Sequence, residues 1–159
     1  MNIAEGVSPV RHLDFLTPED GFSVTGSSKK GLYIDPRSYA RYNLAADLFA
    51  SLDTPGSARL YTRLKPLLDQ AYWNLGYPDE DFDDAVRAAT RELLEVPLSE
   101  GPLAVSPVVI TYEFTDPELE GLSPAQRHLL RMGPKNVRQI QTKLRQLASA
   151  LGIPASELP

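Results

Sequence analysis

The sequence predicts a mainly α-helical fold with a minor β part, organised as a single compact domain over residues 1–159. Two observations predict about five helices. Four prolines directly follow capping side chains, and apolar residues recur every three or four positions after these prolines. A third observation, a few short stretches rich in β-branched and aromatic residues, predicts only a small hairpin or strand element.

The proline pairs mark where helices begin. They are Asp35-Pro36, Thr54-Pro55, Asp116-Pro117 and Ser123-Pro124. A capping oxygen before a proline is typical of a helix start, because the first helical residue needs no N–H and proline already has a helical φ. Gln126 also completes a capping box with Ser123.

From these starts we expect a helix over residues 36–52, continuous or broken near Asn43, and a second over 55–75 with a kink at Pro66. A third helix is expected over 80–95. The side chains expected to face inward are Tyr39, Leu44, Leu48 and Phe49 in the first helix, Leu60, Leu64, Leu67, Leu68 and Ala71 in the second, and Phe82, Val86, Ala89, Leu93 and Leu94 in the third.

The strand signal is weaker. Residues 22–24 and 32–34 flank a polar turn over 26–31 and predict a hairpin. The best single strand is expected over 108–114, which is rich in β-branched and aromatic residues. Residues 1–20, whose start is either natural or truncated, and residues 96–107 are expected to be irregular.

The C-terminal part predicts a helical hairpin over residues 121–151. A short helix over 124–132 stops at Gly133, and Pro134 opens a second helix that runs to about residue 151. One apolar seam follows 3-4-3-4 spacing, formed by Val137, Ile140, Leu144, Leu147 and Leu151. The basic residues are expected on the faces away from that seam.

The net charge of −5 hides a polarised distribution. Residues 121–150 contain six of the 16 basic residues and no acid, so the rest of the chain holds 10 basic against 21 acidic residues. We therefore expect a basic hairpin packed on an acidic body.

Composition leaves few routes to catalysis. The chain has no cysteine, which excludes disulfides, thiol nucleophiles and cysteine-based metal sites. His12 and His128 are isolated from each other, and neither belongs to a zinc-binding or hydrolase motif. We expect no enzyme, no catalytic residue, no metal site and no cofactor. A hidden enzyme would need a deep pocket on which titratable groups converge.

Three other patterns have a structural and a functional interpretation. Residues 26–31 have the spacing of a phosphate loop but lack the Lys-Ser/Thr that follows one, so a hairpin turn is favoured. The acidic residues 79–84 stabilise a helix start or form a weak cation site or a site for a basic partner. The aromatic residues form core or line a ligand groove: Tyr39, Tyr42, Tyr61, Tyr72, Trp73 and Tyr77.

The segment over residues 132–140 resembles the second half of a helix-hairpin-helix DNA-binding motif. In that motif a Gly-x-Gly turn points backbone N–H groups at a phosphate, but here Arg131 holds the first glycine position. The net negative charge also disfavours DNA. The alternatives are a capped hairpin with a solvated basic face, or a basic face that docks on the acidic residues of the same chain.

Three segments carry a family resemblance. They are residues 32–42 (LYIDPRSYARY), 60–78 (LYTRLKPLLDQAYWNLGYP) and 112–144 (YEFTDPELEGLSPAQRHLLRMGPKNVRQIQTKL). Together they resemble a bacterial family catalogued as domain of unknown function 3014. Typical members begin with a membrane anchor and a proline-rich linker, so the resemblance implies residence in the cell envelope. No established activity or site residue carries over. This chain shows neither anchor nor signal, and we expect it to be soluble.

We therefore expect a non-enzymatic binding or scaffolding module of the bacterial cell envelope. Its partner would be a protein or a cell-wall polymer, with membrane contact only through an anchor that this chain lacks. The expected contact surface is Arg127, Arg131, Lys135 and Arg138. The alternative is nucleic-acid binding through the same hairpin. The sequence does not indicate an oligomeric state.

Overall fold

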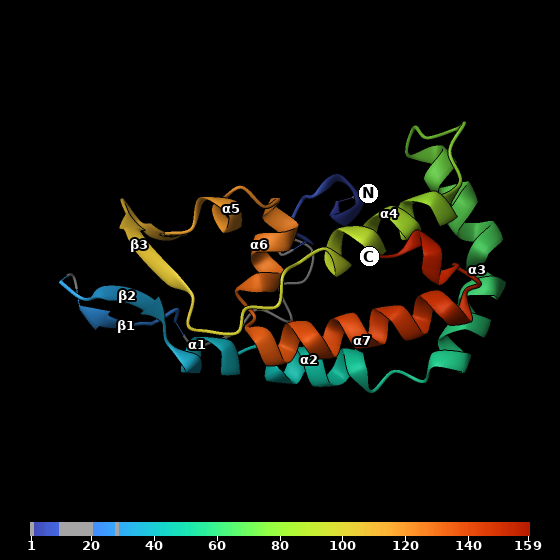
Figure 1. The fold of residues 1–159 in the computed structure, drawn as a ribbon. Helices are drawn as coiled ribbons and strands as arrows, with labels where there is room; N and C mark the ends of the chain where they lie inside the picture. Colours follow the sequence, from blue (N-terminus) through green and yellow to red (C-terminus); the bar gives the residue numbers. More distant parts are fainter. Residues whose placement is uncertain (1, 10–20, 28) are drawn as a thin grey trace.

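A computed structural model describes residues 2–9, 21–27 and 29–159 of the chain. The sheet lies at one end of an elongated molecule and α3 at the other (Figure 1). The helices are α1 (Pro36–Ala40), α2 (Asn43–Ala50), α3 (Thr54–Asn74), α4 (Phe82–Leu94), α5 (Pro117–Glu120), α6 (Pro124–Leu130) and α7 (Pro134–Ala150), with short 3₁₀ turns at Ile3–Glu5 and Ala155–Glu157. The predicted fold class, mainly helical with a small β part, is confirmed.

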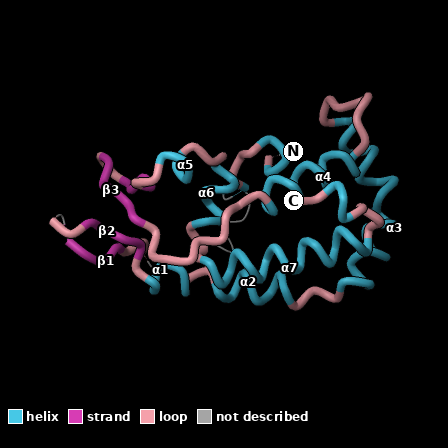
Figure 2. Tube along the Cα trace, viewed as in Figure 1, coloured by secondary structure: helices cyan, strands magenta, loops and turns pink. Residues whose placement is uncertain are grey.

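The strands form one antiparallel sheet in the order β1 (Val24–Ser27), β2 (Gly31–Ile34), β3 (Ala104–Val108), β4 (Thr111–Phe114). Figure 2 shows that the strands gather at one end, while helices and loops make up the rest. The predicted hairpin across residues 26–31 is confirmed, with Val24 opposite Ile34. Two residue pairs, Leu32 with Val105 and Tyr33 with Ala104, join the two hairpins into one sheet.

The prediction of a single strand over residues 108–114 is wrong. The segment turns back at Val109 and Ile110, so that Val108 lies opposite Thr111 and Val105 opposite Phe114. Residues 96–107 are consequently not all irregular, because β3 begins at Ala104. The turn was not recognised because it contains no glycine, proline, asparagine or aspartate, the residues that usually mark a turn.

The helix starts follow the capping signals. Asp35, Asp116 and Ser123 each accept a backbone N–H at the start of their helix, and Ser123 and Gln126 form the predicted capping box. Thr54 was predicted to cap α3, but Asp53 does so instead and accepts the Gly56 N–H at 2.8 Å. The first predicted helix is broken into α1 and α2. α3 continues through Pro66, and the kink there stays a prediction.

The hydrophobic core lies where the inner face of the sheet meets α6 and the first half of α7. Its buried members are Ile34, Val96, Leu103, Val105, Phe114, Leu129, Leu130 and Val137. Val137 starts the predicted apolar seam of α7 and is completely buried, whereas the later seam residues are partly buried. The end of the molecule that carries α3 lies outside this core cluster, and its packing differs from the prediction.

The predicted inward faces of α2 and α3 are wrong for most of their residues, whereas Phe49 and Leu68 are partly buried. Leu44 and Leu48 of α2 are mostly exposed, and α2 instead buries Ala46 beside α7. On α3 the leucines predicted to be buried, Leu60, Leu64 and Leu67, are exposed, as is Ala71. α3 turns its aromatic side towards α4, where Tyr61 and Tyr72 contact the ring of Phe82.

Candidate interaction surfaces

The joint between α6 and α7 is closed by the protein itself. Gly133 has a φ of +86° and is buried against the ring of Tyr39. Asn136, 1% exposed, donates from Nδ2 to the Tyr39 carbonyl at 3.0 Å and to the Met132 carbonyl at 2.8 Å. The segment that resembles a DNA-binding turn is therefore packed on α1, which covers the glycine expected to approach a phosphate.

Two of the four predicted contact residues are engaged within the chain. Arg127 forms an ion pair with Glu120 of α5. Arg131 donates to the Tyr112 carbonyl at 2.8 Å, and its guanidinium lies 5.0 Å from the centre of the Phe114 ring. Burial, together with the nearby Arg127, lowers the pKa of Arg131. These side chains tie α6 to α5 and to the sheet.

The other two predicted contact residues, Lys135 and Arg138, are exposed on α7. The four residues of the predicted contact surface therefore do not form one surface on which all four charged groups are exposed. Lys143 was expected on an outer face and is buried instead. Its ammonium group donates to the Leu52 carbonyl at 2.8 Å and to Thr54 Oγ1 at 3.2 Å. The expectation that all basic residues point away from the seam is wrong for Lys143, because α7 uses it to hold the α2–α3 junction.

His128 is partly buried on α6. Its ring meets the ring of Tyr42 edge-on at 5.9 Å. Burial, with Arg131 and Arg41 nearby, lowers its pKa below the ordinary value of 6.5. This environment favours the neutral imidazole. His12 lies outside the described residues.

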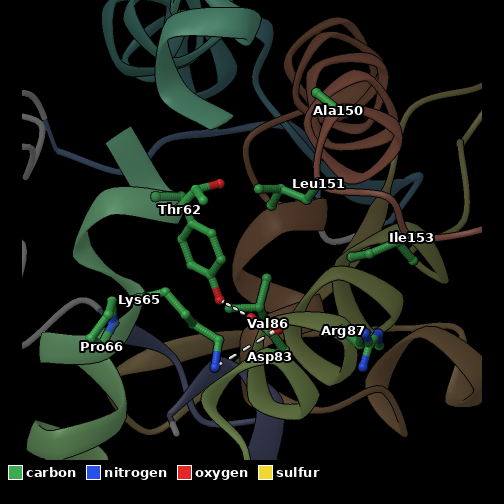
Figure 3. Close-up of a pocket in the computed structure, with 10 residues that line it drawn as sticks. Thr62, Lys65, Pro66, Asp83, Val86, Arg87, Ala150, Leu151 and Ile153 are labelled. Carbon is green, nitrogen blue, oxygen red and sulfur yellow. Dashed lines mark hydrogen bonds and ion pairs between the residues drawn. The ribbon is translucent and has the colours of Figure 1, made fainter. Parts of the chain in front are cut away.

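Part of the acidic segment over residues 79–84 is paired with neighbouring side chains. The Lys65 ammonium group lies 2.6 Å from a carboxylate oxygen of Asp81 and 3.8 Å from one of Asp83, as the close-up in Figure 3 shows for Asp83. Tyr61 donates its hydroxyl to Asp83. The hydrogen bonds from Lys65 to Asp69 and Asp81 raise the pKa of Lys65, and the hydrogen bond from Lys65 lowers the pKa of Asp81. Asp81 also caps α4, as the structural interpretation predicted.

A cavity of about 320 Å³ lies between α3, α4 and the end of α7 (Figure 3). Its lining combines apolar and charged side chains: Tyr61, Thr62, Lys65, Pro66, Asp83, Val86, Arg87, Ala150, Leu151 and Ile153. Lys65 is paired with Asp69, Asp81 and Asp83 and Arg87 with Asp84, so both cations already have partners. The remaining apolar wall of the cavity is formed by Pro66, Val86, Ala150, Leu151 and Ile153.

The predicted aromatic group does not converge on this cavity. Among its members only Tyr61 lines it. Tyr72 is buried and stacks on Tyr77 with the ring centres 4.5 Å apart, while Trp73 is 60% exposed. Tyr39 packs on Gly133 and Tyr42 on His128, at the other end of α7. The aromatic residues therefore serve mainly as separate packing points.

An apolar face of α3, which the leucine spacing predicted to lie inward, is exposed in the structure. Leu60 and Leu67 are 57% and 62% exposed, and Leu64 and Leu75 are also exposed. The spacing of these leucines was visible in the sequence, but α3 carries a second apolar side with Tyr61, Leu68 and Tyr72. Periodicity alone does not tell which of two apolar sides meets the core. We call Leu60, Leu64, Leu67, Ala71 and Leu75 the leucine face.

The described residues limit what else the chain contains. Among them, no group of three or more His, Asp or Glu side chains is arranged to hold a metal ion. Within the same residues, no helix has both the length and the apolar character needed to cross a bilayer. Comparison with curated proteins gives no match, and neither does comparison with solved structures. A family model described as "protein of unknown function (DUF3014)" matches residues 1–148, and the chain therefore belongs to this family.

Proposed function

We propose that this protein is a non-enzymatic scaffolding module that binds a second copy of itself through the leucine face of α3. The observation that carries the proposal is the orientation of α3. The helix buries Tyr72 and directs Lys65 and Tyr61 to the acidic start of α4, while its leucines face solvent. For the compartment we propose the bacterial cell envelope, on the family resemblance alone.

The exposed leucines are unusual for a helix that packs on its own protein. A surface helix normally turns its apolar stripe to the core and its charged residues to water. Contiguous apolar surface of this kind is typical of an interaction site. α3 has 21 residues and is therefore about 31 Å long, so the leucine face offers a continuous strip rather than an isolated side chain.

The spacing of the leucine face suits another helix. Leu60, Leu64, Leu67 and Ala71 are separated by four, three and four residues, the pattern with which paired helices interlock their side chains. A two-fold symmetric pair is the simplest assembly that covers this face on both copies at once. The strip is small compared with the about 800 Å² per partner of a standard interface, so we expect a dimer with micromolar or weaker affinity.

Charge favours an antiparallel arrangement. Arg59 and Arg63 flank one side of the leucine face in its first half, and Gln70 and Asn74 flank the same side in its second half. An antiparallel pair places each arginine beside the amides of the other copy. In a parallel pair the two copies of this side would lie on opposite edges of the interface, so the arginines would not meet these amides.

Sedimentation velocity over a concentration series tests the proposal. The wild-type protein is expected to shift from monomer to dimer, and the double variant Leu60→Glu/Leu64→Glu to remain monomeric. Leu98→Glu is the matched control, since Leu98 is a similarly exposed leucine outside the helices, and it should dimerise as the wild type does. A wild-type protein that stays monomeric at the highest concentration contradicts the proposal.

Cysteine cross-linking tests the arrangement, because the chain has no natural cysteine. Leu67 lies near the middle of the leucine face, so in an antiparallel pair the two copies of Leu67→Cys meet and form an intermolecular disulfide. Leu60→Cys lies at one end and should cross-link only when mixed with Leu75→Cys. Efficient cross-linking of Leu60→Cys with itself would instead indicate a parallel pair.

The nucleic-acid alternative gains no support from the geometry. The turn at Gly133 is covered by Tyr39, and Arg127 and Arg131 already have partners within the chain. Lys135 and Arg138 remain as exposed cations for an acidic partner or polymer. A titration with duplex DNA at low salt decides the matter, since true phosphate contacts give an affinity that falls steeply as salt is added.

A further inference from the structure

The connection between β3 and β4 is an exposed apolar tip. It consists of Val109 and Ile110, which are 99% and 96% exposed. Two-residue hairpin turns favour glycine, asparagine and aspartate, and these two β-branched residues supply none of the usual turn chemistry. A sequence that breaks a local preference and exposes apolar side chains completely is typical of a site where the residues serve a contact.

Two lysines lie at the same end of the sheet. Lys29 and Lys30 occupy the turn between β1 and β2 and are exposed. Because Leu32 of β2 lies opposite Val105 of β3 and the strands are antiparallel, the start of β2 lies beside the end of β3. Both hairpin turns therefore point towards the same end of the molecule, as Figure 1 shows.

A tyrosine lies close to each of the two hairpin turns. Tyr33 lies in β2, two positions from the first residue of the strand, and Tyr112 lies in β4 opposite Pro107. Both residues are partly exposed, and the ring of Tyr112 also packs against Phe22 beside the core. The nearest acid along the β3–β4 hairpin, Glu113, lies one position further back, opposite Ser106. From the tips inward the sheet thus presents apolar and basic side chains, then tyrosines, and only then a carboxylate.

We propose that this end of the sheet docks on an anionic lipid bilayer, with Val109 and Ile110 entering the interface and Lys29 and Lys30 contacting lipid headgroups. The shape favours a bilayer, because a projecting tip can enter a soft interface, whereas a protein partner needs a matching pocket. The charge is complementary to anionic lipid. Tyrosine is enriched at the depth where the tips would place Tyr33 and Tyr112.

This contact differs from the sequence-based expectation that a membrane is reached only through an anchor. Neither an apolar tip nor a pair of lysines alone gives stable attachment, and the two signals act together. The proposal is independent of self-association, since the hairpin tips and the leucine face of α3 lie at opposite ends of the molecule (Figure 1). Two copies paired through α3 would bind the bilayer more tightly than one only if both pairs of tips reached the same bilayer.

The test is co-sedimentation of the full chain with vesicles of phosphatidylcholine, with or without phosphatidylserine. The wild type is expected to sediment with the anionic vesicles and to be released by salt. Val109→Asn/Ile110→Gly removes the apolar tip while installing a favoured two-residue turn, and should weaken binding by at least about tenfold. Lys29→Glu/Lys30→Glu should weaken it by at least about 30-fold.

Leu60→Ser/Leu64→Ser serves as the control for the other apolar surface. It leaves both hairpins intact and should weaken sedimentation with vesicles only because it removes the dimer. Measurements at concentrations where the wild type is monomeric separate this loss from a direct effect on lipid binding. Circular dichroism of every variant checks the fold. The proposal is overturned if the wild type does not bind anionic vesicles, if both hairpin variants bind as the wild type does, or if the leucine variant abolishes binding at monomeric concentration.

Discussion

The ring of Tyr39 lies directly on the α-carbon of Gly133. A β-carbon at position 133 would lie 2.5 Å from Cγ of Tyr39 and 2.7 Å from its Cβ. Gly133 also has φ +86° and ψ 159°, a backbone conformation that is almost confined to glycine. Backbone geometry and packing therefore both demand glycine where α6 joins α7, and α1 holds that joint closed.

Gly133→Ala is expected to lower the free energy of unfolding by about 2–4 kcal/mol, because it adds backbone strain and forces Tyr39 aside. Urea unfolding followed by circular dichroism measures the change. Gly101→Ala is the control: its β-carbon would meet no atom within 4 Å, and its φ lies outside the range that disfavours a side chain. A Gly133→Ala protein as stable as the control would show that the joint is looser than described.

Gln141→Leu is expected to destabilise the fold although leucine fits the surrounding apolar residues. The Nε2 group of Gln141 donates to the carbonyls of Leu93, Leu94 and Val96, and so caps the end of α4 from α7. Leucine leaves these acceptors without that donor, at a cost of about 1–3 kcal/mol. Gln146→Leu, on the exposed side of α7, should change the unfolding free energy by less than about 0.5 kcal/mol. Equal effects of the two substitutions would argue against the cap.

His128 is expected to make stability depend on pH near neutrality. Burial, Arg131 and Arg41 lower its pKa in the folded state below 6.5, so the unfolded chain takes up a proton first as the pH falls. The stabilisation is complete above about pH 6.5 and is lost progressively as the pH falls towards the lowered pKa. Its origin is the burial of the ring beside two guanidinium groups, which disfavours the charged imidazolium in the folded state.

Comparing urea midpoints at about pH 7.5 and about pH 5.5 measures this dependence. The wild type should lose stability between the two values, and His128→Phe, which keeps an aromatic ring against Tyr42, should lose measurably less. An unchanged pH dependence in His128→Phe would show that other groups produce it.

The local signals in the sequence predicted most helix boundaries correctly. The capping side chains before Pro36, Pro117 and Pro124 begin helices as expected, because a cap acts on backbone groups within three residues and needs no distant partner. The hairpin over residues 26–31 followed from its polar turn in the same way. The turn at Val109 and Ile110 was missed because its residues carry no such local signal.

Burial was harder to predict than secondary structure. α3 has two sides able to pack, and the spacing of its leucines predicted that they lie inward. The structure buries Tyr72 and directs Tyr61 towards Asp83, because hydrogen bonds and the ring of Phe82 are available there. Likewise the basic residues of the C-terminal hairpin were recognised, but the acceptors for Arg127, Arg131 and Lys143 come from distant parts of the chain.

The sequence alone therefore determined the fold class, the positions of most helices, the basic helical hairpin around Gly133 and the family to which the chain belongs. Only the tertiary structure decided which apolar side chains are buried, which charged groups find a partner within the chain, and which of both remain at the surface. The physical reason is the distance along the chain over which each interaction acts. Caps and turns are set by neighbours along the chain, whereas the leucine face of α3 and the exposed pair Val109 and Ile110 depend on what the rest of the fold leaves uncovered.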